Sequence, residues 1–150
     1  MKKVTMLCMM AGAAIAFQAC SENKADKAKG EQAEAATDAA NEANDSLPTV
    51  SETDADFAVK AANGSMLEVE LGKLAEQKAF SPKVKEFGAR MVKDHGEAGD
   101  ELKSIASAKG ITLPAIMGEE QQKYYDELSK LSGKKFDKKY VSLRMVKIWS

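Results

Sequence analysis

The fold of this chain is decided by residues 53–109, which read TDADFAVKAANGSMLEVELGKLAEQKAFSPKVKEFGARMVKDHGEAGDELKSIASAK. Apolar residues recur at the 3.6-residue spacing of an amphipathic helix on both sides of residues 80–82. Ser81 is suited to cap a helix that begins at Pro82, because a proline at the first helical position loses no hydrogen bond. The stretch therefore predicts two long antiparallel helices joined by a tight turn.

Two polar residues interrupt the apolar faces of these helices. Glu68 falls near the middle of the apolar arc of the first helix, whereas Asn63 falls on its polar side. His95 falls within the apolar arc of the second helix, with Asp94 at the edge of that arc. At a rise of 1.5 Å per residue, Glu68 and His95 both lie roughly 20 Å from the turn. An antiparallel hairpin therefore places both residues in one layer, facing inward.

Three interpretations of this polar pair remain open. The first, which we favour, is a buried hydrogen bond between Glu68 and His95 that fixes the register of the two helices. The second is half of a divalent metal site that includes Asp94, although no metal identity is indicated. Ferritin-like dimetal centres use a Glu-x-x-His motif, but Val92 stands three places before His95, which is the chain's one histidine. The third is an exposed pair of no importance. We therefore expect no cofactor, with a divalent metal as the alternative.

Composition limits the class of function. The chain has 150 residues, enough for one domain, and its net charge is -1 with 30% charged residues. There is no basic excess of the kind that nucleic-acid binding requires. The sequence contains no nucleophile–base motif, glycine-rich phosphate loop or Cys-x-x-Cys pair. We therefore expect a protein that is not an enzyme and does not bind nucleic acid.

The N-terminus has the pattern of a lipoprotein signal. Lys2 and Lys3 precede an apolar segment, residues 4–17, that is too short to span a bilayer. Ala19 stands directly before Cys20, and this pattern resembles bacterial signals whose cysteine becomes lipidated. The alternative is an ordinary secretory signal with an incidental cysteine. We predict a signal peptide over residues 1–19, lipidation at Cys20, and a location at the outer membrane, facing the periplasm or the cell surface.

Residues 20–52 are predicted to form a low-complexity linker. They are rich in Ala, Glu, Lys, Asp and Asn, and Leu47 and Val50 are their only larger apolar residues. Such a segment buries too little apolar surface to offset the entropy of the chain. We therefore expect a disordered tether between the lipid anchor and a helical domain over residues 53–150.

Two shorter helices are predicted after the hairpin, over residues 119–131 and 136–148. Lys134-Lys135 and Lys138-Lys139 near the start of the last helix are candidates for contact with anionic lipid. Acidic neighbours favour a solvated polar face instead.

Several segments together resemble the family of domain of unknown function 4142, from about residue 55 to residue 147. The matching segments are Asp56-Phe57, residues 66–75, residues 79–87, Met91-Val92-Lys93-Asp94-His95, residues 110–114 and residues 136–141. The resemblance implies a secreted or lipid-anchored bacterial protein with a ferritin-like antiparallel helical bundle, and a non-enzymatic structural or interaction role.

One departure from the family affects the expected architecture. In the family, the segment that begins at Phe136-Asp137 continues through a second Met-Val-x-Asp-His motif into a further long helix, whereas this chain stops at residue 150. Two outcomes are compatible with this departure, a closed bundle or a partial one. In a partial bundle, a second copy or another protein would cover the apolar face of the hairpin.

Overall fold

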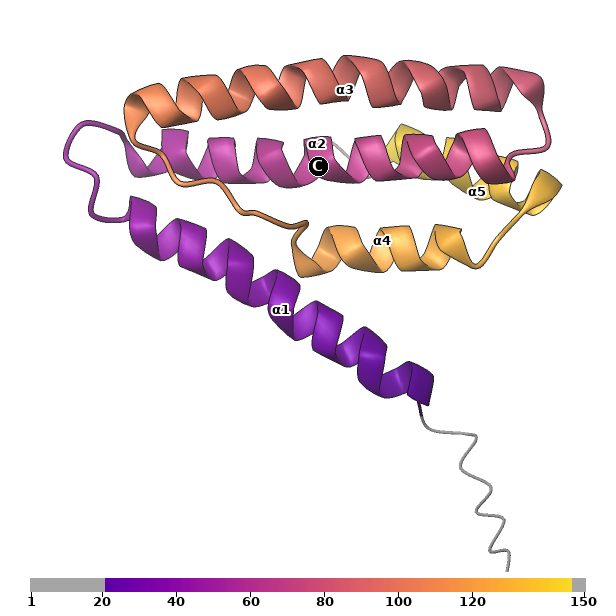
Figure 1. The fold of residues 1–150 in the computed structure, drawn as a ribbon, viewed down its shortest axis with the longest axis horizontal. Helices are drawn as coiled ribbons and strands as arrows, with labels where there is room; N and C mark the ends of the chain where they lie inside the picture. The colour runs from indigo at the N-terminus through magenta and orange to yellow at the C-terminus, as the bar shows by residue number, and fades with distance from the viewer. Residues whose placement is uncertain (1–20, 147–150) are drawn as a thin grey trace, which may run out of the picture.

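The structure is a computed structural model that describes the backbone of residues 21–146 and the side chains of residues 27–143. The described chain is helical throughout, apart from one isolated bridge between Ala79 and Gly133. The helices in chain order are α1 (Ser21–Asn44), α2 (Glu52–Lys78), α3 (Pro82–Lys109), α4 (Glu119–Ser129) and α5 (Gly133–Val146) (Figure 1). This confirms the predicted all-α class and the long hairpin. None of the described helices is long and apolar enough to cross a membrane.

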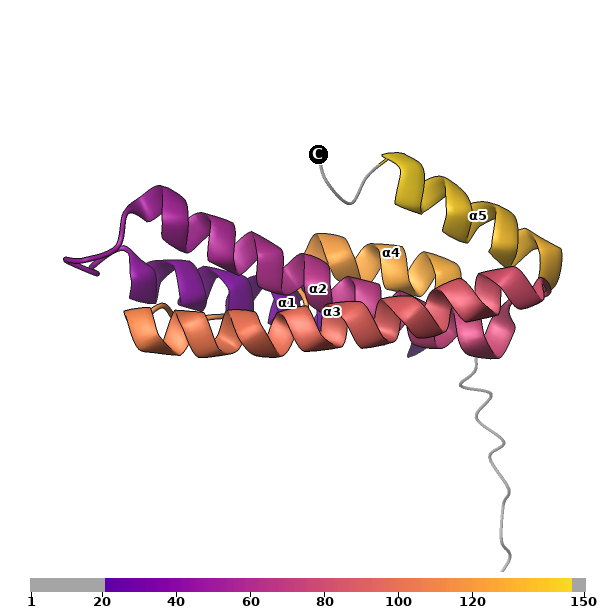
Figure 2. The same cartoon turned by 90° about the horizontal axis from the view of Figure 1, so that it is seen from above.

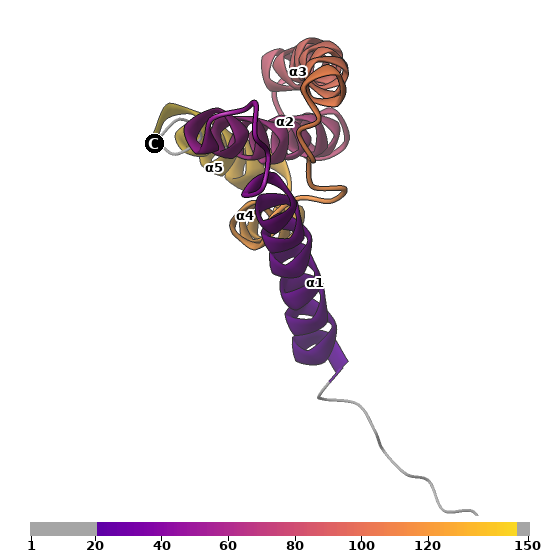
Figure 3. The same ribbon diagram turned by 90° about the vertical axis from the view of Figure 1, so that its left-hand side faces the viewer.

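Helix α2 is the centre of the bundle, because each of the other four helices packs against it. Helix α3 runs antiparallel along one side of α2, and α4 and α1 lie on the opposite side (Figures 1 and 3). Helix α5 lies along a third side, next to the half of α2 that leads into the hairpin turn (Figure 2). A helix surrounded in this way must carry small or apolar residues on several faces. Its buried residues are Ala55, Ala58, Val59, Ala62, Asn63, Leu67, Glu68, Leu71, Gly72, Leu74 and Ala75.

The main apolar core joins α2, α4 and α5 near the hairpin turn. Phe136 and Tyr140 of α5 are fully buried, and their rings stack with centroids 5.5 Å apart. They pack on Leu71 of α2 and Leu128 of α4. Burial raises the pKa of the Tyr140 hydroxyl to about 12, because the interior disfavours the phenolate.

Helix α5 is also held by a polar contact with the hairpin turn. The carboxylate of Asp137 accepts hydrogen bonds from the backbone N–H groups of Phe80 (3.0 Å) and Ser81 (2.9 Å). Both donors precede the first turn of α3, where the helix dipole favours negative charge. Asp137 thus supplies the cap that was expected from Ser81, whose own side chain makes no capping hydrogen bond.

The predicted disordered tether over residues 20–52 is wrong for most of its length, because residues 21–44 form α1. The expectation counted large apolar residues, whereas α1 packs on α4 and α2 through small ones, with Ala33 and Ala40 buried. At the end of α1, the side chain of Asn44 donates to the carbonyl of Thr112 (2.9 Å) and accepts from its N–H (2.7 Å). The predicted signal peptide and Cys20 lie outside the described residues.

A second correction concerns Asn63, which was expected on the solvated side of its helix but is 5% exposed. Its side-chain oxygen accepts from the N–H of Gly118 (2.8 Å), and its side-chain nitrogen lies 3.4 Å from the hydroxyl of Thr37. Asn63 therefore joins α1, α2 and the segment that leads into α4. A burial of this kind depends on a segment far away in the sequence, so helical periodicity cannot show it.

The bundle is partial over the described residues. Helix α5 has 14 residues against 27 in α2, so it covers only part of the face it packs on. Phe57 lies 14 and 18 residues before Leu71 and Ala75, which places it on the face of α2 that α5 covers nearer the turn. Phe57 is 69% exposed, and Ile105 of α3, at the same distance from the turn, is 47% exposed.

The backbones of α2 and α3 approach most closely at two glycines. A Cβ on Gly72 would lie 2.7 Å from the carbonyl oxygen of Gly88, and a Cβ on Gly88 would lie 2.8 Å from that of Gly72. These separations are shorter than real side chains tolerate, and the backbone atoms involved cannot move aside. By contrast, a Cβ on Gly96 of α3 would meet no atom within 4 Å.

We expect Gly72→Ala and Gly88→Ala each to destabilise the protein by about 1–3 kcal/mol, because the added methyl group forces the helices apart. Gly96→Ala is the matched control and should stabilise by about 0.5–1 kcal/mol, because alanine favours the helix and meets no obstacle. Urea unfolding followed by circular dichroism measures all three. Equal effects at the three positions would contradict the close approach of the two backbones.

Candidate functional site

The hairpin brings together the two polar residues that the sequence places in one layer. Glu68 Oε2 of α2 lies 3.8 Å from His95 Nε2 of α3. Glu68 is 2% exposed, and the side chain of His95 is 22% exposed. At this distance the contact is electrostatic, because a hydrogen bond between these atoms requires a shorter separation. The predicted meeting of the two side chains is therefore present, without the short hydrogen bond.

The backbone of His95 is also tied to α2. The hydroxyl of Ser65 donates a hydrogen bond of 2.8 Å to the carbonyl oxygen of His95. Ser65 lies one helical turn before Glu68, so α2 contacts His95 at two successive levels. This second contact fixes the height of His95 along α2.

Asp94, the third candidate residue, is not brought into a common cluster with this pair. It is an exposed residue of α3, and its Oδ2 lies 3.8 Å from Nε of Arg90 on the same helix. Glu68 and His95 supply one carboxylate and one imidazole, whereas a zinc site normally takes at least three protein ligands. No group of three His, Cys, Asp or Glu side chains suited to a metal ion occurs in the described part of the chain.

The environment of His95 lowers the pKa of its imidazole from 6.5. Burial is the main cause, because it disfavours the charged form, and the negative charge of Asp94 opposes the shift. The neutral imidazole is therefore the form that the fold favours at neutral pH. A neutral imidazole can accept a proton or a metal through its unprotonated nitrogen.

The sequence did not indicate an open cleft of about 490 Å³ between α2, α3 and residues 110–118. Its walls are mainly apolar and include Met66, Val69, Leu102, Leu113 and Met117. Gly96 and Gly99 border it from α3, and their missing side chains help to make the hollow. The signal available in the sequence was this pair of glycines inside a helical pattern, where glycine costs stability.

We expect the imidazole of His95 to titrate with a midpoint below 6.5. A buried group whose charged form is disfavoured makes a contribution to stability that is present above pH 6.5 and lost as pH falls through the folded pKa. Because His95 is the chain's one histidine, its Hε1 proton gives a single NMR signal that can be followed with pH. Asp94→Asn should lower the midpoint further. A midpoint at or above 6.5 would show that burial does not control this site.

Comparison with known proteins identifies the family. The sequence matches the family described as Domain of unknown function (DUF4142) over residues 37–147. The match begins within α1 and runs to the end of the described chain, so it includes the hairpin, the Glu68–His95 pair and the capping residue Asp137. No curated protein and no solved structure matches the chain. The chain belongs to the DUF4142 family.

Proposed function

We propose that this protein is a lipid-anchored protein of the bacterial envelope with a non-enzymatic structural or interaction role. The observation that carries the location is the leader with Lys2 and Lys3, an apolar segment, and Ala19 directly before Cys20. Helix α1 begins at Ser21, the residue after the proposed lipidated cysteine. A folded helix therefore follows the proposed anchor directly.

Helix α1 supports a structural role for this anchor. With 24 residues and 1.5 Å per residue, α1 is about 36 Å long. Its C-terminal half is fastened to the bundle through Thr37 and Asn44. A fastened helix holds the bundle in a more defined position relative to the anchor than a flexible coil would.

The uncovered apolar face supports the interaction role. Phe57 and Ile105 expose large apolar side chains on the side of the hairpin that α5 leaves open. A face of this kind on a helical pair gains stability when another helix covers it. We propose that a second copy of this chain or another envelope protein covers it.

The location is tested by substituting the proposed anchor. In a bacterial host fed radiolabelled palmitate, we expect the natural chain to incorporate label and to fractionate with membranes. Cys20→Ser should lose the label, because only the thiol of Cys20 can accept the lipid. Label retained by Cys20→Ser, or its absence from the natural chain, would refute the anchor.

The interaction face is tested by placing charge on it. We expect the natural chain to associate as its concentration rises, and Phe57→Glu with Ile105→Glu to weaken that association at least tenfold, because the face becomes polar. Gln77→Glu with Ser104→Glu adds the same charge at exposed polar positions and serves as the control. Sedimentation velocity measures the association. A monomer at all concentrations would exclude the second copy as the occupant.

A divalent metal-binding or metal-dependent redox role is a second candidate, favoured by the separation of 3.8 Å between a buried carboxylate and a neutral imidazole. In that case the NMR signal of His95 shifts with one equivalent of Zn²⁺, and Glu68→Gln abolishes the shift. A signal unchanged by Zn²⁺ would leave the pair as a contact that fixes helix register.

A further inference from the structure

Positive charge is concentrated at one end of the molecule. Residues 78–86 and 130–139 together contain eight lysines against two acidic residues, Glu86 and Asp137, although the whole chain has a net charge of -1. The isolated bridge between Ala79 and Gly133 and the contacts of Asp137 bring these two segments together at the hairpin turn. We call this end, residues 78–86 with 130–139, the turn end.

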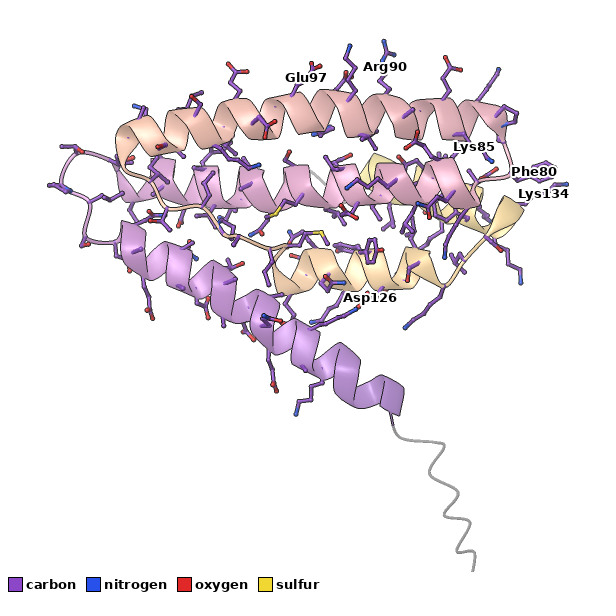
Figure 4. All side chains as sticks on the ribbon, viewed as in Figure 1. Phe80, Lys85, Arg90, Glu97, Asp126 and Lys134 are labelled. Carbon is purple, nitrogen blue, oxygen red and sulfur yellow. The ribbon has the colours of Figure 1, made fainter. Side chains whose placement is uncertain are left out.

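An aromatic side chain projects from the turn end. Phe80 is 63% exposed, and the Nζ of Lys134 lies 5.2 Å from the centre of its ring. Both side chains extend beyond the helices at that end of the bundle (Figure 4). The exposed ring therefore lies among cations at an extremity, not in a groove that another helix would fill.

Most of the lysines at the turn end are available to a partner. Lys78 donates to the carbonyl of Ser129, and Lys139 pairs with Glu127 at 2.9 Å. The other six are exposed and form no ion pair with any side chain that the structure describes: Lys83, Lys85, Lys130, Lys134, Lys135 and Lys138.

The acidic neighbour that favoured a solvated face has another role. Asp137 uses both carboxylate oxygens to accept from the backbone N–H groups of Phe80 and Ser81. Its negative charge faces the turn and the start of α3, so it offsets little of the lysine charge around it.

We infer that the turn end is a docking surface for a bilayer that contains anionic phospholipid. Lysines near an anionic membrane surface are attracted to it, and each adds to the binding. Their long stems let the ammonium groups stay at the headgroups while an adjacent apolar group enters the interface. Phe80 is the apolar group in this position, and the lysines around it supply the charge.

The orientation of α1 agrees with this surface. The N-terminal end of α1 points toward the same end of the long axis as the turn (Figures 1 and 2). Because α1 begins one residue after Cys20, the lipid proposed there and the turn end can face one membrane. This inference rests on the proposed envelope location, and adds a second contact to the single acyl anchor, which alone binds weakly.

The test uses the chain from residue 20 onward with Cys20→Ser, so that no acyl chain contributes. We expect it to co-sediment with vesicles of phosphatidylglycerol and phosphatidylcholine in equal molar amounts, but not with vesicles of pure phosphatidylcholine. The binding should decrease steeply with salt, because the Debye length falls from about 10 Å at 0.1 M to about 3 Å at 1 M.

Paired variants assign the binding to the turn end. Lys134→Gln with Lys135→Gln should weaken binding roughly 30-fold, from about fivefold per lysine. Lys60→Gln with Lys93→Gln removes the same charge from exposed positions elsewhere and should leave binding nearly unchanged. Phe80→Ala should weaken binding at low salt, and Phe80→Trp should give a blue-shifted emission on the mixed vesicles only.

The outcomes separate this inference from the proposed anchor. Equal binding to both vesicle types, or equal losses from the two lysine pairs, would overturn the docking surface. Retention on soluble polyphosphate as strong as on the mixed vesicles would show a general polyanion site and would also overturn it. If vesicle binding is absent while Cys20 is labelled by palmitate, only this inference fails. If binding is present and Cys20 is unlabelled, only the anchor fails.

Discussion

The close approach of α2 and α3 at Gly72 and Gly88 is the constraint on which the rest of the structure depends. The two backbones come so near that no Cβ fits at either position. This contact fixes the separation of the two helices and, with it, their relative height. Glu68 and His95 meet at 3.8 Å because each lies about the same number of residues from that contact and from the turn. A shift of one helical turn would move them apart by about 5.4 Å.

The remaining helices are placed by side chains that bind backbone groups of loops. Asn44 pairs with both backbone groups of Thr112, Asn63 accepts from Gly118, and Asp137 accepts from Phe80 and Ser81. Each contact joins segments at least 55 residues apart in the sequence. Apolar packing alone tolerates sliding of one helix along another, whereas a hydrogen bond to a particular N–H does not. These three residues therefore specify where α1, α4 and α5 lie along the hairpin.

The sequence predicted what depends on periodicity and missed what depends on distant segments. The hairpin, its turn and the layer shared by Glu68 and His95 follow from 3.6-residue spacing and a rise of 1.5 Å per residue, and all three are present. The burial of Asn63 was missed because its partners come from α1 and from Gly118. Helix α1 was missed because its contacts with α2 and α4 use alanines, which composition alone assigns to a linker. The positive turn end was missed because Lys83 and Lys85 are far in sequence from Lys134 and Lys135.

The two ends of the hairpin differ in chemistry, and this difference has a consequence for orientation. At the turn end, α5 covers the core, and exposed lysines surround one exposed aromatic ring. At the other end, α5 is absent over the described residues, and Phe57 and Ile105 are exposed on the side of the hairpin. A membrane contact at the turn end would leave the open face pointing along the membrane normal and away from the lipid. A protein partner would then reach Phe57 and Ile105 without competing with the bilayer, so the two proposed contacts are compatible in one molecule.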